Sequence, residues 1–292
     1  MGRLVWLVDR AGGFGVWTTD LAGGDARQYL SDLDEESTAI LDAQLVGEDV
    51  ALLRERAGRA GGELWVVSSS QPPRWVMGDV TSFLPSGDAE LLAVVDLRTT
   101  RSIWRVPLDG TAPASIAQLQ IPDHGPAVGP FGFALSPDAR TVAAGWVGGP
   151  VEVIGPTPMS LRDVGAPLVV ADDGRLVATT GRAGEAYLVD GDLLVELAPA
   201  DSDPVAVPGT GSVAWASVGE DGGLVAVEVR DLLAGTSETH PATGLATNVR
   251  ELGEWYVILE ATAFDPLIRT VTVIDRRDGR SATFEASAPA GD

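Results

Sequence analysis

The sequence predicts an all-β fold, a β-propeller of seven blades made mostly of four antiparallel strands. Three observations lead to this prediction. A short strand-like pattern recurs along the whole chain, its apolar residues alternate with a period of two, and 35 Gly and 19 Pro are spread over the 292 residues. With 45% apolar residues, a chain of this length can bury a large core. We therefore expect a single domain over residues 1–292.

The recurring pattern is an apolar residue, an aromatic residue, any residue and a second apolar residue, followed in most copies by a polar turn with Gly. Clear copies surround Trp17, Trp65 and Trp104. Weaker copies lie at residues 151–155, 186–191, 224–227 and 270–275. From Trp17 to Val271 there are six steps of about 42 residues on average, which suits the ~40–50 residues of a propeller blade. The aromatic residue is expected to pack between neighbouring blades.

An apolar strand is expected before each copy of the pattern. These strands are predicted at residues 3–10, 49–55, 90–97, 140–147, 175–180, 212–218 and 254–261. The approximate blades are 1–34, 35–80, 81–130, 131–165, 166–203, 204–243 and 244–292. No long stripe with a period of 3.6 residues occurs, so we expect no major helix, and residues 32–41 are the one weak helix candidate.

Two polar turns and one strand end carry a resemblance to a known family. Residues 135–143, Leu-Ser-Pro-Asp-Ala-Arg-Thr-Val-Ala, and residues 171–178 resemble the Ser-Pro-Asp-Gly element of TolB-like and Trp-Asp-repeat propellers. Residues 17–24 resemble the third strand and turn of the same repeat. The chain departs from the family because the fourth to sixth units are short and lack the Trp of the repeated pattern, and because no blade ends in a clear Trp-Asp pair. The resemblance implies the fold and leaves the function open, since propellers host many activities.

The first blade starts on its second strand at Arg3 and lacks an innermost strand. The last blade has four candidates at residues 246–251, 254–261, 269–274 and 281–286, and the remaining tail, with Pro289 and Gly291, is poor strand material. We expect a three-stranded first blade that packs against the last through apolar side chains. The alternatives are that the tail closes the ring, or that the chain is a piece of a longer protein whose upstream segment completes the blade.

The net charge of −22 indicates what the surface can bind. All 20 cations are Arg, against 42 carboxylates. Such a field repels nucleic acid and anionic lipid, and it favours a cationic partner or a divalent metal ion. The simpler interpretation is a solvated acidic surface that keeps the protein soluble.

Several chemistries are excluded by composition. Without Cys there is no disulfide, thiolate nucleophile or Cys-ligated zinc, and without Lys there is no Schiff base or phosphate-loop Lys. The two histidines, His124 and His240, are expected in turns and lie near no Gly-x-Ser-x-Gly motif. We therefore predict no catalytic residue, no His-based metal centre and no tightly bound cofactor.

Carboxylates leave two weaker possibilities. Residues 136–141 partly resemble the sialidase Asp-box but lack its Gly and Trp, and among 42 acids no pair stands out as that of a glycoside hydrolase. Calcium is a possible ligand of the Asp-rich turns at residues 172–174 and 32–36, although neither fits a calcium-binding loop. Turn formation by Asp is the favoured interpretation, and the presence of a metal stays open.

The leading functional hypothesis is a non-enzymatic protein-interaction or scaffolding propeller with an acidic surface. The loops at residues 32–37 and 121–130 are expected to bind, because binding residues concentrate on loops of a rigid scaffold. One alternative is an accessory domain or hydrolase-type enzyme that gates or positions a substrate, and another is a small-ligand or cation binder in the central channel. The expected partner is a protein with a basic surface, bound more weakly at high salt, with no nucleic acid and no membrane insertion.

The compartment is predicted from what the sequence lacks. The apolar run near Leu4–Val8 is too short for a signal peptide, and no segment has the ~18 apolar residues of a membrane span. We expect a cytoplasmic protein, or an extracytoplasmic one if the chain is a piece of a longer protein.

Overall fold

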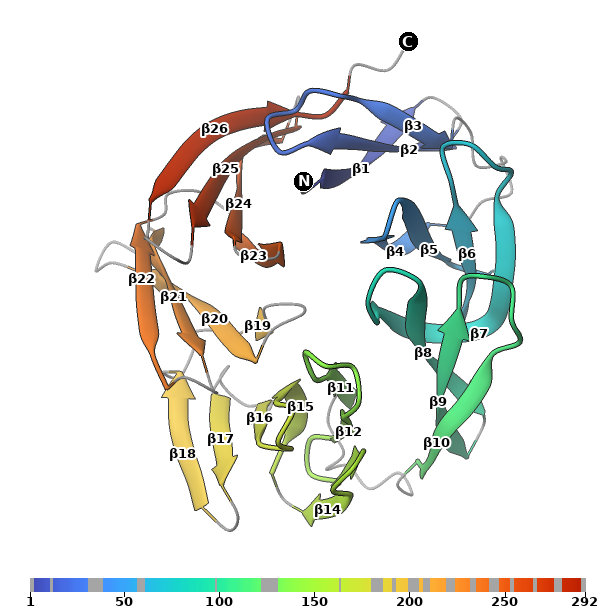
Figure 1. Ribbon diagram of the computed structural model, residues 1–292, viewed down its shortest axis with the longest axis vertical. Helices are drawn as coiled ribbons and strands as arrows, with labels where there is room; N and C mark the ends of the chain where they lie inside the picture. Colours follow the sequence, from blue (N-terminus) through green and yellow to red (C-terminus); the bar gives the residue numbers. More distant parts are fainter. Residues whose placement is uncertain are drawn as a thin grey trace. The chain divides into compact units, whose positions relative to one another are not determined.

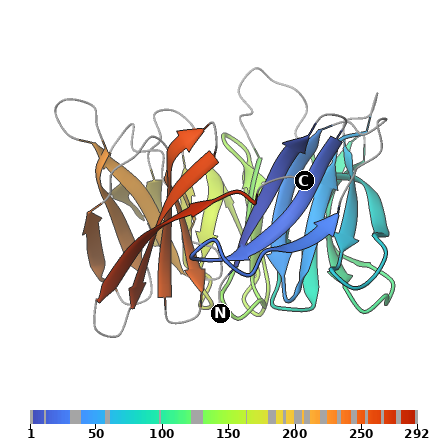
Figure 2. The same ribbon diagram turned by 90° about the horizontal axis from the view of Figure 1, so that it is seen from above.

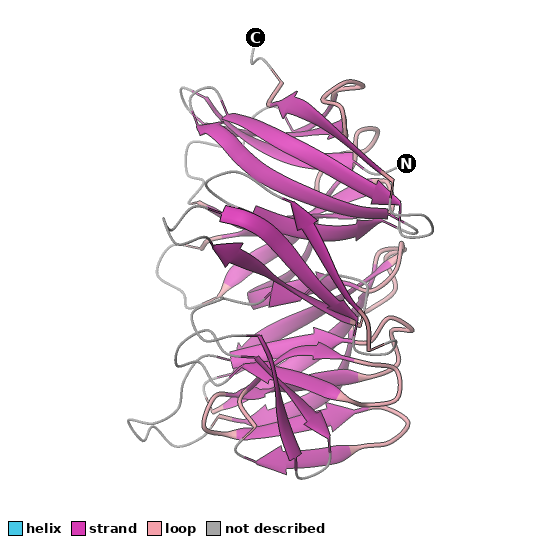
Figure 3. Cartoon of the chain, turned by 90° about the vertical axis from the view of Figure 1, so that its left-hand side faces the viewer, coloured by secondary structure: helices cyan, strands magenta, loops and turns pink. Residues whose placement is uncertain are grey.

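The computed structural model consists of β-strands joined by turns and loops (Figure 3). It describes residues 3–10, 13–30, 39–56, 61–97, 99–121, 131–162, 164–179, 186–190, 193–198, 205–206, 211–218, 224–231, 235–241, 247–252, 255–264, 267–275 and 280–289. Within these ranges there is no helix, and hence none long and apolar enough to cross a membrane. Most of the weak helix candidate, residues 32–38, lies outside them, and Ile40 and Leu41 belong to a strand.

The chain divides into two compact units, each of which is treated by itself. The first consists of Met1–Ile121, Asp265–Ile268 and Glu285–Asp292, and the second of Pro122–Phe264 and Arg269–Phe284. All strand pairs given for the described residues are antiparallel neighbours in sequence (Figure 1). Short turns therefore connect most paired strands.

The first unit holds a three-stranded sheet and a seven-stranded sheet. The three-stranded sheet is β1 (Arg3–Arg10), β2 (Gly13–Asp20) and β3 (Arg27–Leu30), drawn side by side in blue in Figure 2. The seven-stranded sheet is β4 (Ile40–Val46), β5 (Asp49–Arg54), β6 (Gly62–Val67), β7 (Arg74–Pro85), β8 (Glu90–Leu97), β9 (Thr100–Pro107) and β10 (Ala114–Gln120).

The other four sheets have four strands each and lie mostly in the second unit. One sheet consists of β11 (Phe131–Leu135), β12 (Val142–Trp146), β13 (Pro150–Ile154) and β14 (Met159–Arg162), and the next of β15 (Ala166–Val170), β16 (Leu176–Thr179), β17 (Ala186–Asp190) and β18 (Leu193–Ala198). A third consists of β19 (Val205–Ala206), β20 (Ser212–Val218), β21 (Leu224–Asp231) and β22 (Ser237–Pro241). The fourth consists of β23 (Thr247–Leu252), β24 (Trp255–Phe264), β25 (Leu267–Asp275) and β26 (Ser281–Ser287).

The predicted strands are confirmed. The seven copies of the repeated pattern lie on β2, β6, β9, β13, β17, β21 and β25, and the seven strands predicted before them are β1, β5, β8, β12, β16, β20 and β24. The four strands predicted for the end of the chain are β23 to β26, and the first sheet has three strands, as expected. The number of seven blades and their boundaries stay predictions, and the predicted boundary between residues 80 and 81 falls inside β7.

The long strand β7 joins two groups of strands in the seven-stranded sheet. Its first part pairs with β6, from Val66↔Arg74 to Gly62↔Val80, and its second part pairs with β8, from Val80↔Val95 to Pro85↔Leu91. Just before the shared residue Val80, Asp79 has a positive φ of 59°, and the register of both pairings shifts near this point. The bend brings the two groups face to face, so that their side chains form one core.

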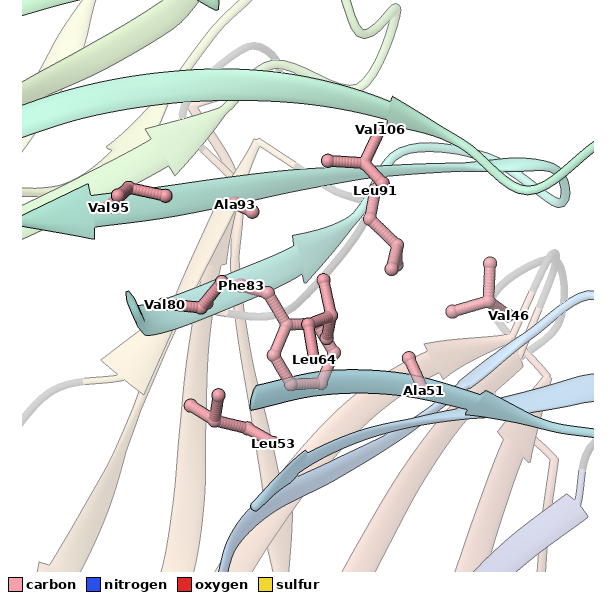
Figure 4. Close-up of a cluster of buried hydrophobic side chains, with 10 residues drawn as sticks. All are labelled: Val46, Ala51, Leu53, Leu64, Val80, Phe83, Leu91, Ala93, Val95 and Val106. Carbon is pink, nitrogen blue, oxygen red and sulfur yellow. The ribbon is translucent and has the colours of Figure 1, made fainter. Parts of the chain in front are cut away.

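This core is the cluster shown in Figure 4. It contains Phe83 from β7, Leu64 from β6 and Leu91 from β8, all of them fully buried, and Trp104 packs against it. A second cluster joins the three-stranded sheet to β5 and β6, with Val16 and Tyr29 on one side and Trp65 packed against it. Trp65 and Trp104 thus pack between successive groups of strands, as expected for the aromatic position of the repeat.

The described tail does not pair with the first strand. In the part of the chain that the structure describes, β1 pairs only with β2, whereas the amide of Ala288 donates to the carbonyl oxygen of Leu267 at 3.3 Å. The turn at Gly23 lies close to the end of β26, because a Cβ on Gly23 would be 3.4 Å from the Cα of Ala286. Apolar packing of the first sheet on the last sheet stays a prediction.

Candidate binding surface

Two acidic turns lie next to each other in the first unit. The turn between β4 and β5 contains Gly47 and Glu48, and the turn between β7 and β8 contains Asp88. Gly47 has a φ of +61°, and a Cβ there would lie 2.6 Å from the carbonyl oxygen of Asp88. Only a residue without a side chain fits this approach. The exposed carboxylates of Glu48 and Asp88 are thus carried by adjacent turns, which we call the acidic turn pair.

Hydrogen bonds fix the backbone of the acidic turn pair. The hydroxyl of Tyr29, on β3, donates to the carbonyl oxygen of Glu48 at 2.7 Å. Ser86 is buried and its amide donates to the carbonyl oxygen of Glu90 at 2.8 Å, which closes the second turn. Because these backbone positions are fixed by packing and hydrogen bonds, a ligand of the carboxylates would have little backbone to order.

Two further turns meet in the second unit. One lies between β11 and β12 and contains the Ser-Pro-Asp element of the sequence, and the other lies between β15 and β16. Asp138 accepts hydrogen bonds from the Ser136 hydroxyl at 2.6 Å and from the Arg140 amide at 3.0 Å. Its own amide donates to the carboxylate of Asp172, in the next sheet, at 2.9 Å. The residues that partly resemble a sialidase Asp-box therefore form a turn and a contact between two sheets, with Ala139 at a φ of 59°.

These carboxylates are stabilised in the ionised form. The hydrogen bond from the Ser136 hydroxyl, followed by that from the Arg140 amide, lowers the pKa of Asp138. Burial opposes ionisation of Asp173, but the backbone and side chain of Arg175 outweigh it and lower the pKa of that carboxyl. Arg140 and Arg175 also offset part of the charge of these turns.

The predicted turn position of His240 is wrong. His240 lies on the edge strand β22 and pairs with Val227 of β21, because Glu238-Thr239-His240 continues the ladder until Pro241 ends it. Its side chain is 12% exposed, with Nε2 3.3 Å from Oε2 of Glu238. Burial lowers the pKa of His240, and the nearby carboxylates of Glu238 and Glu228 oppose this shift.

The burial of His240 predicts a loss of stability in mild acid. Because its pKa is lower in the folded chain than the usual ~6.5, the unfolded chain takes up the proton first as the pH falls. We expect the urea midpoint of the wild type to drop more between pH 7.5 and 5.5 than that of His240→Gln, which cannot take up this proton. Equal drops in both proteins would show that His240 does not contribute.

The other sequence-predicted site residues divide into turn residues and residues outside the described part. His124, the acidic stretch at residues 32–36 and residues 122–130 of the predicted binding loop lie outside it. Asp173 accepts hydrogen bonds from the Arg175 amide at 3.1 Å and its Nε at 2.8 Å, and Gly174 has a φ of +88°, so this turn follows ordinary Asp-Gly chemistry. Among the described residues, no three His, Cys, Asp or Glu side chains are grouped to hold a metal ion.

Sequence reasoning missed the acidic turn pair. Each turn has a signal, Val-Gly-Glu-Asp at residues 46–49 and Ser-Gly-Asp-Ala-Glu at residues 86–90, in which Gly and an acid follow an apolar strand. These patterns predict two turns, but they do not predict that Gly47 packs on the backbone of Asp88.

Comparison with known proteins shows the fold. No family model and no curated protein sequence matches the chain. Solved structures do match, at low identity. TolB from Acinetobacter baumannii is 12% identical with a TM-score of 0.55, and the match covers 100% of this chain and 65% of TolB. The β-propeller domain of the Trilobed protease from Pyrococcus furiosus, described as having an open velcro topology, is 12% identical with a TM-score of 0.60, covering 96% and 93%.

A third similar structure is prolyl oligopeptidase B from Galerina marginata bound to a 35mer substrate, which is 10% identical with a TM-score of 0.64. That match covers 98% of this chain and 48% of the oligopeptidase, so the chain spans about half of that enzyme and about two thirds of TolB. The chain has a β-propeller fold that resembles TolB-like propellers, and these likenesses carry the fold alone.

Proposed function

We propose that the chain is a non-enzymatic protein-interaction propeller whose acidic turn pair meets a basic surface of its partner. The observation that carries this proposal is the fixed approach of two turns that expose Glu48 and Asp88, with 2.6 Å between a Cβ on Gly47 and the Asp88 carbonyl oxygen. Rigid turns bind with a small loss of conformational entropy. A chain of net charge −22 also attracts a basic partner from a distance.

The lowered pKa values of two turn carboxylates, Asp138 and Asp173, support a binding role. A general acid needs a raised pKa, near the working pH, whereas the pKa values of Asp138 and Asp173 are lowered. The composition supplies no Cys or Lys nucleophile, and His240 is largely buried on β22, where it pairs with Val227. These groups suit permanent negative charge better than proton transfer.

A second candidate function is that of an accessory domain that positions a peptide for a catalytic partner. Two similar structures come from proteolytic enzymes, the Trilobed protease and prolyl oligopeptidase B, and the latter was solved with a 35mer substrate. In this candidate the bound chain would be a peptide delivered to a second domain or protein. The acidic turn pair would then favour basic peptides.

The proposal predicts binding that depends on salt and on two carboxylates. We expect a Lys-rich model peptide to bind the wild type at low ionic strength and to lose affinity at 0.5 M NaCl, where exposed charges are screened within a few Å. The double substitution Glu48→Gln/Asp88→Asn should weaken binding about five-fold at low salt, as expected when two exposed charge pairs are lost. Fluorescence anisotropy of the labelled peptide measures both effects.

A matched control removes two carboxylates elsewhere. Glu152→Gln/Glu285→Gln changes the net charge by the same amount, and the amide oxygen introduced in place of the Glu152 carboxylate can still accept the hydrogen bond from Ser160. If this variant weakens binding as much as Glu48→Gln/Asp88→Asn does, overall charge is responsible and the acidic turn pair is not the site. An affinity that is the same at both salt concentrations would remove electrostatics from the proposal.

A further inference from the structure

In sequence alignment, β1 corresponds to the second of the four strands in the other sheets. In those sheets a first strand pairs with the second strand, but among the described residues β1 has no such neighbour. The equivalent strands β5, β8, β12, β16 and β20 each pair with a strand on both sides. The same holds for β24, which lies between β23 and β25. In the described residues β1 pairs with β2 alone. Within the part of the chain that the structure describes, the other edge of β1 is therefore an unpaired row of backbone hydrogen-bonding groups.

The side chains of β1 are less buried than those of most of its equivalents. On β5 the four residues Val50 to Leu53 are at most 2% exposed, and β8, β12 and β16 are buried equally along their centres. On β1, Leu4 and Trp6 are buried, but Val5 and Val8 are half-buried and Leu7 is 38% exposed. The neighbour of Leu7 across the ladder, Val16, is fully buried, so the exposure belongs to the open side of β1.

The sequence of β1 is as apolar as that of its covered equivalents. Residues 4–8 read Leu-Val-Trp-Leu-Val, and Arg3 ties the start of the strand to Thr18 and Asp25 at 2.9 and 2.7 Å. An apolar strand with an unpaired edge is a template for another strand, and soluble proteins usually blunt such an edge with charge or Pro. Residues 4–8 contain neither.

We propose that a partner protein adds an extended apolar segment to β1 as an antiparallel strand. This inference rests on the proposed function and names the way in which the partner is bound. The chain itself contains examples of such a segment, because the innermost strand Ala166–Val170 is apolar and the innermost strand Ile40–Val46 carries Leu41, Ala43 and Leu45 at alternate positions, and both pair antiparallel with the strand that follows them. Main-chain hydrogen bonds supply affinity in such strand addition, and the apolar side chains would cover Leu7.

The charge of the chain indicates what flanks the apolar segment. With 42 carboxylates against 20 Arg, a segment flanked by Lys or Arg is attracted, and one flanked by acids is repelled. The partner segment is therefore a run of about five to seven residues, apolar on at least one face, with basic residues on either side.

A synthetic peptide tests this proposal on the whole chain. The probe has the sequence of Ile40–Val46 flanked by two Lys residues at each end, and the control is the same peptide with N-methyl groups on alternate amides, which cannot form the ladder. We expect the probe to slow hydrogen exchange about ten-fold or more at those amides of residues 4–8 that point away from β2, and the control peptide to leave them unchanged.

A pair of substitutions distinguishes binding at the β1 edge from nonspecific binding of the probe. Leu7→Asp should weaken probe binding about ten-fold, because a charge would be buried under the added strand. Leu97→Asp, at a residue on the end of β8 that is 44% exposed, should bind as the wild type does. Because the N-methylated peptide needs no substitution, the test holds even if Leu7→Asp lowers stability.

Three results would overturn the proposal. The first is protection, in the free protein, of those amides of residues 4–8 that point away from β2, which would mean that another segment of its own chain covers β1. The second is a dimer that Leu7→Asp converts to a monomer, which would mean that a second copy occupies the edge. The third is protection by the probe at strands other than β1.

The failure of this inference differs from the failure of the proposed function. If the Lys-rich model peptide binds in a salt-dependent way but Leu7→Asp binds the strand probe as the wild type does, strand addition is wrong and the acidic turn pair stands. If the probe adds to β1 while salt and Glu48→Gln/Asp88→Asn have no effect, the acidic turn pair is wrong and the β1 edge stands.

Discussion

Replacement of Phe83 by Ala is expected to lower the free energy of unfolding by about 3–5 kcal/mol. Phe83 is 1% exposed and lies in the cluster that joins the two groups of strands in the seven-stranded sheet (Figure 4). Its ring contributes to a core with Leu64 and Leu91, so truncation leaves a cavity between strands that cannot collapse without moving β7. Urea denaturation followed by circular dichroism measures the change.

The matched control for this prediction is Trp75→Ala. Trp75 is on the same strand, β7, but it is 52% exposed, and its loss should cost less than about 1 kcal/mol. If Phe83→Ala also costs less than about 1 kcal/mol, the bend of β7 does not bring the two groups of strands together as described.

Replacement of Gly132 by Ala is expected to destabilise the second unit by about 1–3 kcal/mol or more. Gly132 lies on β11, and an added Cβ would meet the carbonyl oxygen of Pro167, on β15, at 2.4 Å. Backbone atoms form this obstacle, so no side-chain rotation can relieve it and the two strands would have to separate. Thermal unfolding monitored by circular dichroism should show a lower midpoint.

The control substitution is Gly78→Ala on β7, where the nearest atom to an added Cβ is Cζ2 of Trp75 at 4.0 Å. Here Ala should be neutral or slightly stabilising, because Gly loses more backbone freedom on folding than Ala does. Equal effects at Gly132 and Gly78 would show that β11 and β15 do not pack as closely as the structure has them.

The strand order could be predicted from the sequence because it depends on local pattern. Period-two alternation around Trp17, Trp65 and Trp104, with Gly-containing turns, determined where strands begin and end. The three strands of the first sheet followed from the same alignment, because Arg3 matches a second strand rather than a first. Even the weak copies without Trp lie on the expected strands.

Features that depend on tertiary context could not be predicted. The sequence places His240 in a turn because Thr239 and Pro241 are common in turns, but pairing with Val227 extends the edge strand through both. The continuity of β7 was hidden because Gly78-Asp79 has the composition of a turn, whereas the structure uses Asp79, at a φ of 59°, to bend one strand. Local propensity gives way to pairing in both cases.

The candidate surface shows the same division. The acidic character of the chain and the turn chemistry of Asp138 and Asp173 follow from the sequence. The acidic turn pair does not, because Glu48 and Asp88 are 40 residues apart in number and meet only when two groups of strands pack. The missing inner neighbour of β1 was predicted from the sequence, because Arg3 aligns with the start of second strands, whereas the exposure of Leu7 depends on tertiary packing.

The central claim, that this propeller binds a protein through its acidic turn pair without catalysis, is tested most directly by affinity capture from the native host. The wild type, Glu48→Gln/Asp88→Asn and Glu152→Gln/Glu285→Gln are used as baits at low salt and at 0.5 M NaCl. We predict that the wild type and the second variant retain one and the same basic partner at low salt, and that the first variant and high salt both reduce its recovery. Equal recovery by all three baits at both salt concentrations, or turnover by the purified chain on a panel of hydrolase substrates, would contradict the claim.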